Sequence, residues 1–577
     1  MFDTNTNKPI AALNLTSIKP QLSYFIDENR LILVTSKNTR IGGYRGRHDI
    51  STAVSFNVQT KDVYRLLEPG NGIYKGQTRL GSIVGLSSNG KFAYMPAYTS
   101  EATYSLMKAF IDKRRTPRVF KKGTSDTIDF FVENKDNLLA RERYDNEDDL
   151  HRIESYIDDE WVTIFSENTP YKTRAFVGLT PDYKSLVMLA QNDAGRWAYY
   201  TMALSDGKIS EALFNKSEKD VENVLTDVSR VVYGVQYSGF KPTYEFFDDN
   251  LTKMFDEMRQ QSPHDSLHLI DHTPDWKKVV VKIEGSTSSG DYFIYDGKEF
   301  QYLTSARQKI SPENVHQITE FRYETRDGVT IPTLITLPKV EKVNNLPAMI
   351  LPHGGPESYD QIEFNWLAQY FASKGFIVVQ PQFRGSTGFG AEHTLSGRGE
   401  WGRKMQNDLT DAVTVLKNKG YINPEQVCIA GISYGGYAAL AGAVFTPDLY
   451  KCVISINGVS DVDAMMTTER RNYGSDHWVV SYWEDVIAKG SFNEDHLAQI
   501  SPINHAKKIQ APVLLIHGTY DKVVPIDQSE EMEEALEDED KDVTFVELPR
   551  GDHHLSTYKN RIAAMHAIDK FVDKDFN

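Results

Sequence analysis

One short segment carries a serine in a setting that suits nucleophilic catalysis. Gly431-Ile432-Ser433-Tyr434-Gly435 follows the apolar run QVCIA and precedes the small-residue run YAALAGAV. In a G-x-S-x-G turn the chain reverses sharply between strand and helix, so side chains at the glycine positions would clash while the serine hydroxyl projects above the sheet. The bare pattern occurs by chance in long chains. Its place between a buried strand and a helix predicts that Ser433 is a nucleophile.

A serine nucleophile needs a base, and the base needs an acid that fixes its tautomer. After a strand-turn-helix nucleophile, the acid and the base are expected in the order Asp, His at the ends of later strands. Asp521 follows the strand-like run APVLLIHG, and His553-His554 follow the next such run, DVTFVELP. We therefore predict Asp521 as the acid, with a turn residue as its alternative role, and we favour His553 over His554 as the base. Asp552 is an alternative acid, disfavoured because it adjoins the histidine in sequence.

The oxyanion of an acyl-transfer reaction needs backbone N–H donors. One is expected from Tyr434, directly after the nucleophile, and one from the loop that follows the early strand AMILPHGG. We assign the second donor to Gly355, with Gly354 as the alternative. His353 in this loop is disfavoured as a catalytic residue, because it precedes the nucleophile and another histidine already fits.

The elements that position these residues alternate between strand and helix from about residue 318 to the end of the chain. FRYETRDGVTIPTLITLP (321–338) predicts a hairpin that turns at Asp327-Gly328. Alternation of apolar strands with amphipathic helices predicts a mostly parallel sheet with helices on both faces, as in an α/β hydrolase, over residues 316–577. The predicted strands are AMILPHGG (348–355), FIVVQPQF (376–383), QVCIAGIS (426–433), CVISINGV (452–459), APVLLIHG (511–518) and DVTFVELP (542–549).

Residues 1–315 have a different pattern, with short alternating strands and almost no stretch of helical period. A polar turn followed by an apolar strand recurs at residues 87, 133, 180, 226 and 273, at intervals of 46, 47, 46 and 47 residues, and an earlier copy starts at residue 26. Such a period, at about four strands per unit, predicts the blades of a β-propeller, six or seven in number. A β-sandwich with coincidental spacing is the alternative.

Composition narrows the function classes. The 577 residues carry a formal net charge of −16 and show no basic stripe, which argues against nucleic acid as a partner. Only two cysteines occur, Cys428 and Cys452, so a disulfide framework or a zinc site is not expected, and both are interpreted as core residues. No metal or other cofactor is expected. No window is long enough for a membrane span and no signal peptide is visible, which favours the cytoplasm; a removed leader would make the protein periplasmic or secreted.

Several of these segments together resemble the prolyl oligopeptidase family of serine peptidases, and most closely its acylaminoacyl-peptidase and dipeptidyl-peptidase-like bacterial members. The family's acid motif HGxxDxxVP reads His517 to Pro525 here, and alignment of GDHHLS (551–556) puts the catalytic histidine at His553. The resemblance implies a propeller that caps an α/β hydrolase and restricts substrates to short peptides. Some members carry an oxyanion-hole tyrosine where this chain has His353, so a hole made of backbone donors is expected.

The sequence says less about specificity. In relatives, the stretch that corresponds to residues 472–486 helps to form the pocket for the residue before the cut, so Trp478 and Tyr482 are candidate substrate-binding residues, together with Tyr473 and Trp483; core packing is the alternative. Arg384 is a candidate for holding a carboxylate or carbonyl of the substrate, with a structural salt bridge as its alternative. The acidic segment 146–161 is interpreted as a solvated loop rather than a site for the substrate's amino terminus.

The leading hypothesis is a metal-free serine peptidase for short peptides. An esterase on the same machinery and a catalytically inactive propeller that binds a partner are the alternatives. The sequence leaves open whether the cut is internal or terminal, and whether the chain forms a homo-oligomer.

Overall fold

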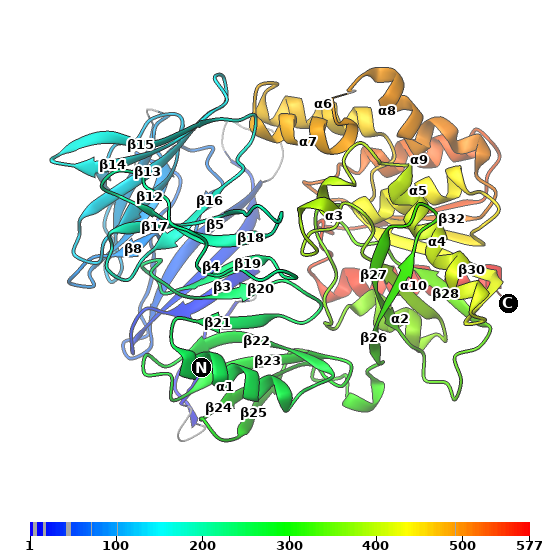
Figure 1. Cartoon of the computed structure of the whole chain (residues 1–577), viewed down its shortest axis with the longest axis horizontal. Helices are drawn as coiled ribbons and strands as arrows, with labels where there is room; N and C mark the ends of the chain where they lie inside the picture. Colours follow the sequence, from blue (N-terminus) through cyan, green and yellow to red (C-terminus); the bar gives the residue numbers. More distant parts are fainter. Residues whose placement is uncertain are drawn as a thin grey trace.

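A computed structural model describes residues 1–3, 8–15, 19–41, 48–70, 72–100, 102–490 and 492–576. The chain forms two bodies that lie side by side, one built of antiparallel sheets and one of alternating strands and helices (Figure 1). The last strand of the first body, β25, ends at Ser305, and the first strand of the second, β26, begins at Ile318. The helix η1 (Pro312–Asn314) lies between them. The boundary at residues 315/316 stays a prediction.

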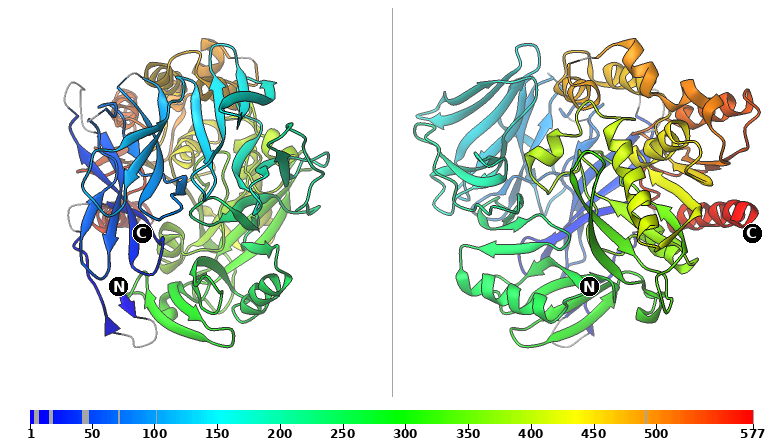
Figure 2. Two further views of the ribbon diagram at one scale, coloured as in Figure 1. Left: turned by 90° about the vertical axis from the view of Figure 1, so that its left-hand side faces the viewer. Right: turned by 45° about the vertical axis from the view of Figure 1, so that its right-hand side comes forward.

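The N-terminal body is a six-bladed β-propeller, which confirms the class inferred from the sequence repeat. Six sheets follow one another around a common centre when seen from the propeller side (Figure 2, left). They are β3 (Lys19–Phe25), β4 (Arg30–Thr39), β5 (His48–Asn57) and β6 (Val63–Arg65), with β7 (Arg79–Leu80) beside β5; β8 (Gly85–Leu86), β9 (Phe92–Tyr98), β10 (Tyr104–Phe110) and β11 (Arg118–Lys121); β12 (Thr127–Val132), β13 (Leu138–Asp145), β14 (Leu150–Ile157) and β15 (Glu160–Asn168); β16 (Ala175–Leu179), β17 (Ser185–Gln191) and β18 (Trp197–Ala203); β19 (Val221–Thr226), β20 (Val232–Tyr237) and β21 (Thr243–Phe246); and β22 (Asp265–His272), β23 (Val279–Gly285), β24 (Ser289–Tyr295) and β25 (Phe300–Ser305). A short pair, β1 (Phe2–Asp3) and β2 (Lys8–Pro9), precedes them.

The sequence repeat corresponds to one structural position. Each recurring turn-and-strand unit forms the second strand of a blade, namely β4, β9, β13, β17, β20 or β23. This strand is the apolar one because it lies inside its sheet, between two neighbours, and packs against adjacent blades on both faces. Among the described residues six such sheets are found, so the count of six rather than seven blades holds there.

One element of the propeller was not expected from the sequence. Helix α1 (Asp249–Gln260) stands between β21 and β22, where the pattern indicated strands. Asp248 caps its first turn by accepting the Asn250 N–H, and the helix buries Phe255 and Met258 against the last two blades. The acidic start and the spacing of the apolar residues were the missed signals.

The C-terminal body contains an eight-stranded sheet in the order β26-β27-β29-β28-β30-β31-β32-β33. The strands β26 and β27 form the predicted hairpin, β27 pairs antiparallel with β29, and all other neighbours are parallel. This is the α/β-hydrolase class that the alternation predicts. The strands are β26 (Ile318–Glu324), β27 (Thr330–Thr336), β28 (Leu346–Ile350), β29 (Ile377–Pro381), β30 (Ile422–Ile432), β31 (Cys452–Ile456), β32 (Val513–Gly518) and β33 (Val543–Leu548).

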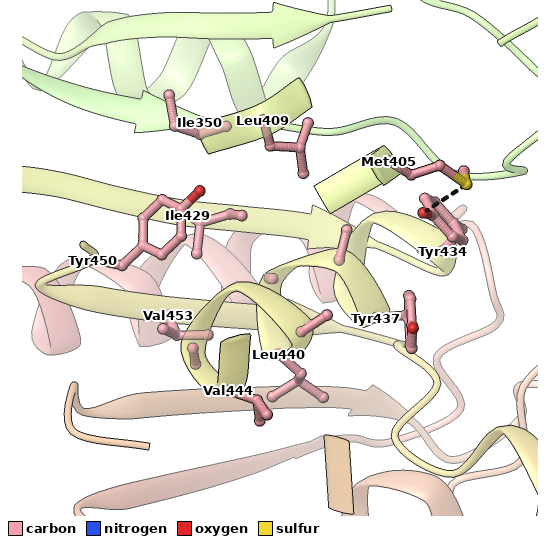
Figure 3. Packing of buried hydrophobic residues seen from close by; sticks show 14 of the residues in the cluster. Ile350, Met405, Leu409, Ile429, Tyr434, Tyr437, Leu440, Val444, Tyr450 and Val453 are labelled. Atoms are coloured by element: carbon pink, nitrogen blue, oxygen red, sulfur yellow. Dashed lines mark hydrogen bonds between the residues drawn. The ribbon is translucent and has the colours of Figure 1, made fainter. Parts of the chain in front are cut away.

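Helices cover both faces of this sheet. On one face α2 (Trp366–Ser373) and α10 (Tyr558–Phe576) pack against alternate strand residues; on the other lie α4 (Lys404–Asn418), α5 (Tyr434–Phe445) and α9 (Asp527–Glu537). Figure 3 shows the core on the face covered by α4, α5 and α9, where α5 packs over β30. The Tyr434 hydroxyl lies 3.7 Å from the Met405 sulfur there. The remaining helices are α3 (Ala391–Leu395), α6 (Val462–Tyr473), α7 (Trp478–Ala488), α8 (Glu494–Ile500) and η2 (Pro502–Lys508).

The interpretation of the two cysteines as plain core residues is wrong in one respect. Both are fully buried, but a disulfide joins Cys428 to Cys452. They stand directly opposite each other on the parallel neighbours β30 and β31, with Cα atoms 4.8 Å apart, so their side chains point to the same face and meet. The count of two excludes a framework of several bridges, not a single one.

Candidate active site

Ser433 occupies a strained turn between β30 and α5. Its backbone has φ 61° and ψ −121°, a conformation that non-glycine residues rarely adopt, and its N–H donates to the Ile456 carbonyl at 3.0 Å. The flanking glycines are required by close backbone contacts. A Cβ on Gly431 would lie 2.3 Å from the Gly435 backbone, and one on Gly435 would lie 2.2 Å from the Pro352 carbonyl oxygen. The elbow expected from the sequence is therefore present.

Asp521 and His553 are hydrogen-bonded to each other. The His553 Nδ1 lies 2.7 Å from Asp521 Oδ2, while Asp521 Oδ1 accepts the N–H groups of Val523 at 2.8 Å and Val524 at 3.0 Å. The other imidazole nitrogen, Nε2, makes no hydrogen bond to any described residue, and neither does the Ser433 hydroxyl. His554 is exposed, and the hydrogen bond to the Asp521 carboxylate comes from His553 instead. Of the two neighbouring histidines, it is therefore His553 that the structure pairs with the acid.

Asn457 connects the three loops that carry these residues, a role that was not predicted from the sequence. Its side chain donates to the His553 carbonyl at 2.8 Å and accepts the Gly518 N–H at 2.9 Å. Its own N–H donates to Ile516, and it directly follows the residue that accepts the Ser433 N–H. Asn457 directly follows the last residue of β31 and has a positive φ of 47°. Its position at a strand end is visible in the sequence, but its bonds to the other loops are not.

The two residues predicted to supply the oxyanion donors, Tyr434 and Gly355, line the same cavity as Ser433. Tyr434 is the first residue of α5, so the helix does not use its N–H. Gly355, with φ 129°, lines the same cavity as Ser433 and precedes a cis peptide bond to Pro356. Gly354 lies against the elbow, since a Cβ there would be 3.5 Å from the Ser433 Cβ.

His353 is engaged in the structure of the loop. Its Nδ1 lies 2.8 Å from the Gly354 carbonyl, its Nε2 lies 2.8 Å from the Ser386 hydroxyl, and its ring stacks on Phe383. Burial lowers the pKa of this imidazole, which keeps it neutral. His517, beneath Asp521, is likewise neutral for the same reason and is bonded to Ser529 and to the Val524 carbonyl.

A cavity of about 410 Å³ opens beside Ser433. Its walls come from α6, α7, the loop after β32 and, from the propeller, Arg79. The lining residues used below are Gly355, Ser433, Tyr434, Met465, Thr468, Glu469, Asn472, Tyr473, Val479, Trp483 and Lys522. Two of the four aromatic residues named from the sequence, Tyr473 and Trp483, thus face this cavity.

The other two aromatic candidates line a neighbouring cavity. Trp478 and Tyr482 border a space of about 540 Å³ between α7 and the propeller segment around Tyr171. The Tyr482 hydroxyl donates to Glu357 at 3.0 Å, and the Tyr171 hydroxyl of the propeller donates to Asp485 at 2.7 Å. A substrate-binding role for Trp478 and Tyr482 stays a prediction, and it concerns this second cavity rather than the one beside Ser433.

Arg384 is not brought to either cavity. It is buried and bonds through its guanidinium to Asp408 (2.7 Å) and Asp327 (2.8 Å). Hydrogen bonds from Arg384 hold the pKa of the Asp327 carboxyl well below its usual range. Every nitrogen of the guanidinium already has a carboxylate partner, so the geometry favours the salt-bridge alternative over substrate binding.

One group of metal-ligating side chains comes together in the described part of the chain. His268 Nε2 lies 3.6 Å from Glu363 and 3.9 Å from Glu284, at the junction of the last blade with the α/β body. Lys282 and Arg307 already pair with Glu284. Glu284 is thus held by two ion pairs, and His268 lies between it and Glu363 of the α/β body.

The fold and this site define an α/β hydrolase with a nucleophile elbow, preceded by a β-propeller. Residues 362–577 match the model of the prolyl oligopeptidase family, so the catalytic domain belongs to that family and the resemblance inferred from its motifs is confirmed. Within the described residues, no helix is both long and apolar enough to cross a membrane.

Curated relatives match part of the chain. Dipeptidyl aminopeptidase BIII of Pseudoxanthomonas mexicana is 29% identical over 410 residues, which cover 68% of this chain and 58% of that protein. The uncharacterized peptidase YuxL of Bacillus subtilis (strain 168) is 30% identical over 320 residues, covering 52% and 46%. The chain thus spans about half the length of the curated relatives it matches.

Solved structures match nearly the whole chain in fold. A puromycin-hydrolyzing peptidase of Mycobacterium tuberculosis superposes with a TM-score of 0.69 at 16% identity, covering 97% of this chain and 94% of that one. An acylaminoacyl peptidase of Pyrococcus horikoshii gives 0.68 at 16% identity, covering 97% and 96%. These likenesses establish that the propeller and the hydrolase occur together in known proteins.

Proposed function

We propose that this protein is a serine peptidase that cleaves short peptides through an acyl-enzyme on Ser433. The observation that carries the proposal is the Asp521–His553 hydrogen bond beside a strained serine elbow. The bond holds Nδ1 of His553 protonated, which leaves the lone pair on Nε2 to accept the serine proton. The peptidase names of the curated relatives support peptides as substrates.

In the proposed reaction, the Ser433 oxygen attacks the peptide carbonyl while His553 takes its proton. The negative charge that develops on the carbonyl oxygen is stabilised by the N–H groups of Tyr434 and Gly355. His553 then gives the proton to the leaving amine, and water attacks the acyl-enzyme by the same path. Asp521 keeps the imidazole oriented and stabilises its protonated form.

The propeller limits the size of the substrate in this proposal. Arg79 of the propeller lines the cavity that Ser433 opens into, so the propeller contributes to the wall of this cavity. A short or extended peptide can enter such a space, whereas a folded protein cannot. An esterase remains the second candidate, because the same acyl chemistry serves esters.

The test is labelling and turnover of the native chain and of Ser433→Ala. A fluorophosphonate should label the native protein and leave the variant unlabelled, and the variant should lose roughly 10⁴- to 10⁶-fold in kcat. Circular dichroism and thermal melting should stay unchanged. If the protein hydrolysed acyl esters but cleaved no peptide amide, the esterase would replace the peptidase as the proposed function. If the fluorophosphonate did not label the native chain, both candidate functions would be overturned.

A further inference from the structure

Helix α6 presents one of its faces to the cavity beside Ser433. Met465, Thr468, Glu469 and Asn472 are spaced by three and four residues, so they lie on one face of the helix, and all four line the cavity. The opposite wall contributes Val479 and Trp483 from α7. The cavity is therefore mainly apolar, with one ionisable group of α6 among its walls.

That group, Glu469, is a carboxylate without a partner among the residues that the structure describes. It accepts no hydrogen bond and joins no ion pair there, whereas its neighbour Arg470 is paired with Glu484 at 2.8 Å. Glu469 is partly buried, and burial raises the pKa of its carboxyl. Lys522 and Arg79 line the same cavity, but neither forms an ion pair with Glu469.

Partial burial of an unpaired carboxylate in a mainly apolar cavity costs free energy in the free protein. Binding of a cationic group beside the carboxylate would offset this cost. A long aliphatic side chain with a charged tip would satisfy this arrangement in full. Its methylene groups would cover the apolar wall near Trp483, and its ammonium or guanidinium group would reach Glu469. A purely apolar side chain would instead leave the carboxylate desolvated and without a partner.

We propose that this cavity binds the residue before the scissile bond and that Glu469 selects lysine or arginine there. The proposal rests on the proposed peptidase function, because the cavity acquires this meaning only if Ser433 attacks the following carbonyl. Ser433, Tyr434 and Gly355 line the same cavity as Glu469, so the cavity lies next to the proposed reacting group. Glu469 is then a specificity-determining residue with no part in the chemistry itself.

The test compares amide substrates that differ only in the residue before the cut. Lysine and norleucine share the same four-carbon chain, so their kcat/KM ratio isolates the charge. The native protein should cleave the lysine and arginine substrates at least about 10-fold more efficiently than the norleucine substrate. Glu469→Gln should lose about 10- to 100-fold on the two basic substrates, the range expected for one charged hydrogen bond, and change little on norleucine.

Two controls keep the result interpretable. Asp463→Asn removes an exposed charge from the same helix outside the cavity and should leave all the ratios unchanged. Fluorophosphonate labelling of Glu469→Gln at the native rate would establish that Ser433 and its surroundings are intact. Loss that is specific to basic substrates, in a variant that labels normally, supports the proposal.

The opposite outcomes are distinct. Preference of the native protein for norleucine over lysine, or equal loss on all substrates in Glu469→Gln, would overturn the specificity inference while leaving the peptidase function standing. Absence of any amide cleavage together with absence of labelling would overturn the proposed function, and this inference with it.

Discussion

Two clusters of charged and polar side chains lie at strand ends of the catalytic domain. They differ in whether a nitrogen atom remains free of hydrogen bonds to the described residues. After β29, Arg384 is buried between Asp408 and Asp327, and all its nitrogens are bonded. After β32 and β33, Asp521 holds one nitrogen of His553, and the other nitrogen bonds to no described residue. In each cluster a carboxylate bonds to a nitrogen-containing side chain that follows a strand of the sheet.

This is the difference expected between a structural ion pair and the acid–base pair of the proposed mechanism. A buried cation whose donors are all used can stabilise a loop but cannot bind a substrate as well. A group held on one side and open on the other is oriented and still able to exchange a proton. Sequence position did not distinguish them, since both follow apolar strands and both were named as candidate site residues.

Replacement of the open histidine should have the largest effect. His553→Ala should lower kcat by roughly 10⁴- to 10⁶-fold without a change in melting temperature, because it removes the base. His554→Ala, its exposed neighbour, should cost less than about threefold. Steady-state kinetics on one peptide amide measures both. A larger loss in the His554 variant would mean that the Asp521–His553 pair is structural.

The carboxylate that orients the histidine comes next. Asp521→Asn should lower kcat by roughly 10⁴-fold, since an amide no longer fixes the tautomer or stabilises the imidazolium. Asp552→Asn is the matched control, because the Asp552 carboxylate accepts the Ser556 N–H at 2.8 Å and so caps a turn. Its loss should stay within about tenfold. If the two variants lost activity equally, the choice of acid would be wrong.

The closed cluster should respond in stability rather than in chemistry. Arg384→Met leaves Asp408 buried without its partner and should reduce the free energy of unfolding by about 3–5 kcal/mol. Arg326→Met removes a half-exposed guanidinium from the buried Asp411 and should cost less, about 1 kcal/mol, because the backbone N–H of residue 326 still donates to this carboxylate. Denaturant titration measures both, with activity at 25 °C as the second readout. A raised KM with unchanged stability in the Arg384 variant would restore its role in substrate binding.

The disulfide between β30 and β31 should have the smallest effect. It joins two residues that are 24 positions apart in the sequence, and the loop that it closes includes the nucleophile elbow. The double variant Cys428→Ala and Cys452→Ala should lose about 2–4 kcal/mol of stability while kcat at 25 °C stays within about threefold, because neighbouring strands also hold the elbow. Calorimetry and kinetics on the same preparation check this. A large loss of kcat at 25 °C would show that the bridge positions Ser433.

Features that depend on a local and repeated sequence pattern could be predicted, whereas features that depend on contacts between distant segments could not. The propeller and the parallel sheet were predictable because periodicity is local and repeated, and the blade pattern corresponds to one strand position in each of six sheets. Helix α1 was missed because one short amphipathic stretch has little weight inside a long strand pattern. Asn457 was missed because its bonds run to two other loops, and nothing in its neighbours indicates them.

The sequence determined the order Ser433, Asp521, His553 and the elbow around the serine, because strand ends and glycines can be identified from local sequence patterns. The tertiary structure decided which histidine bonds to the acid, that the Arg384 guanidinium is fully bonded to carboxylates, and that the two cysteines face each other. It also decided that Glu469 lines the cavity without an ion-pair partner among the described residues. These features depend on which side chains of distant segments come into contact and on how far each side chain is desolvated by burial.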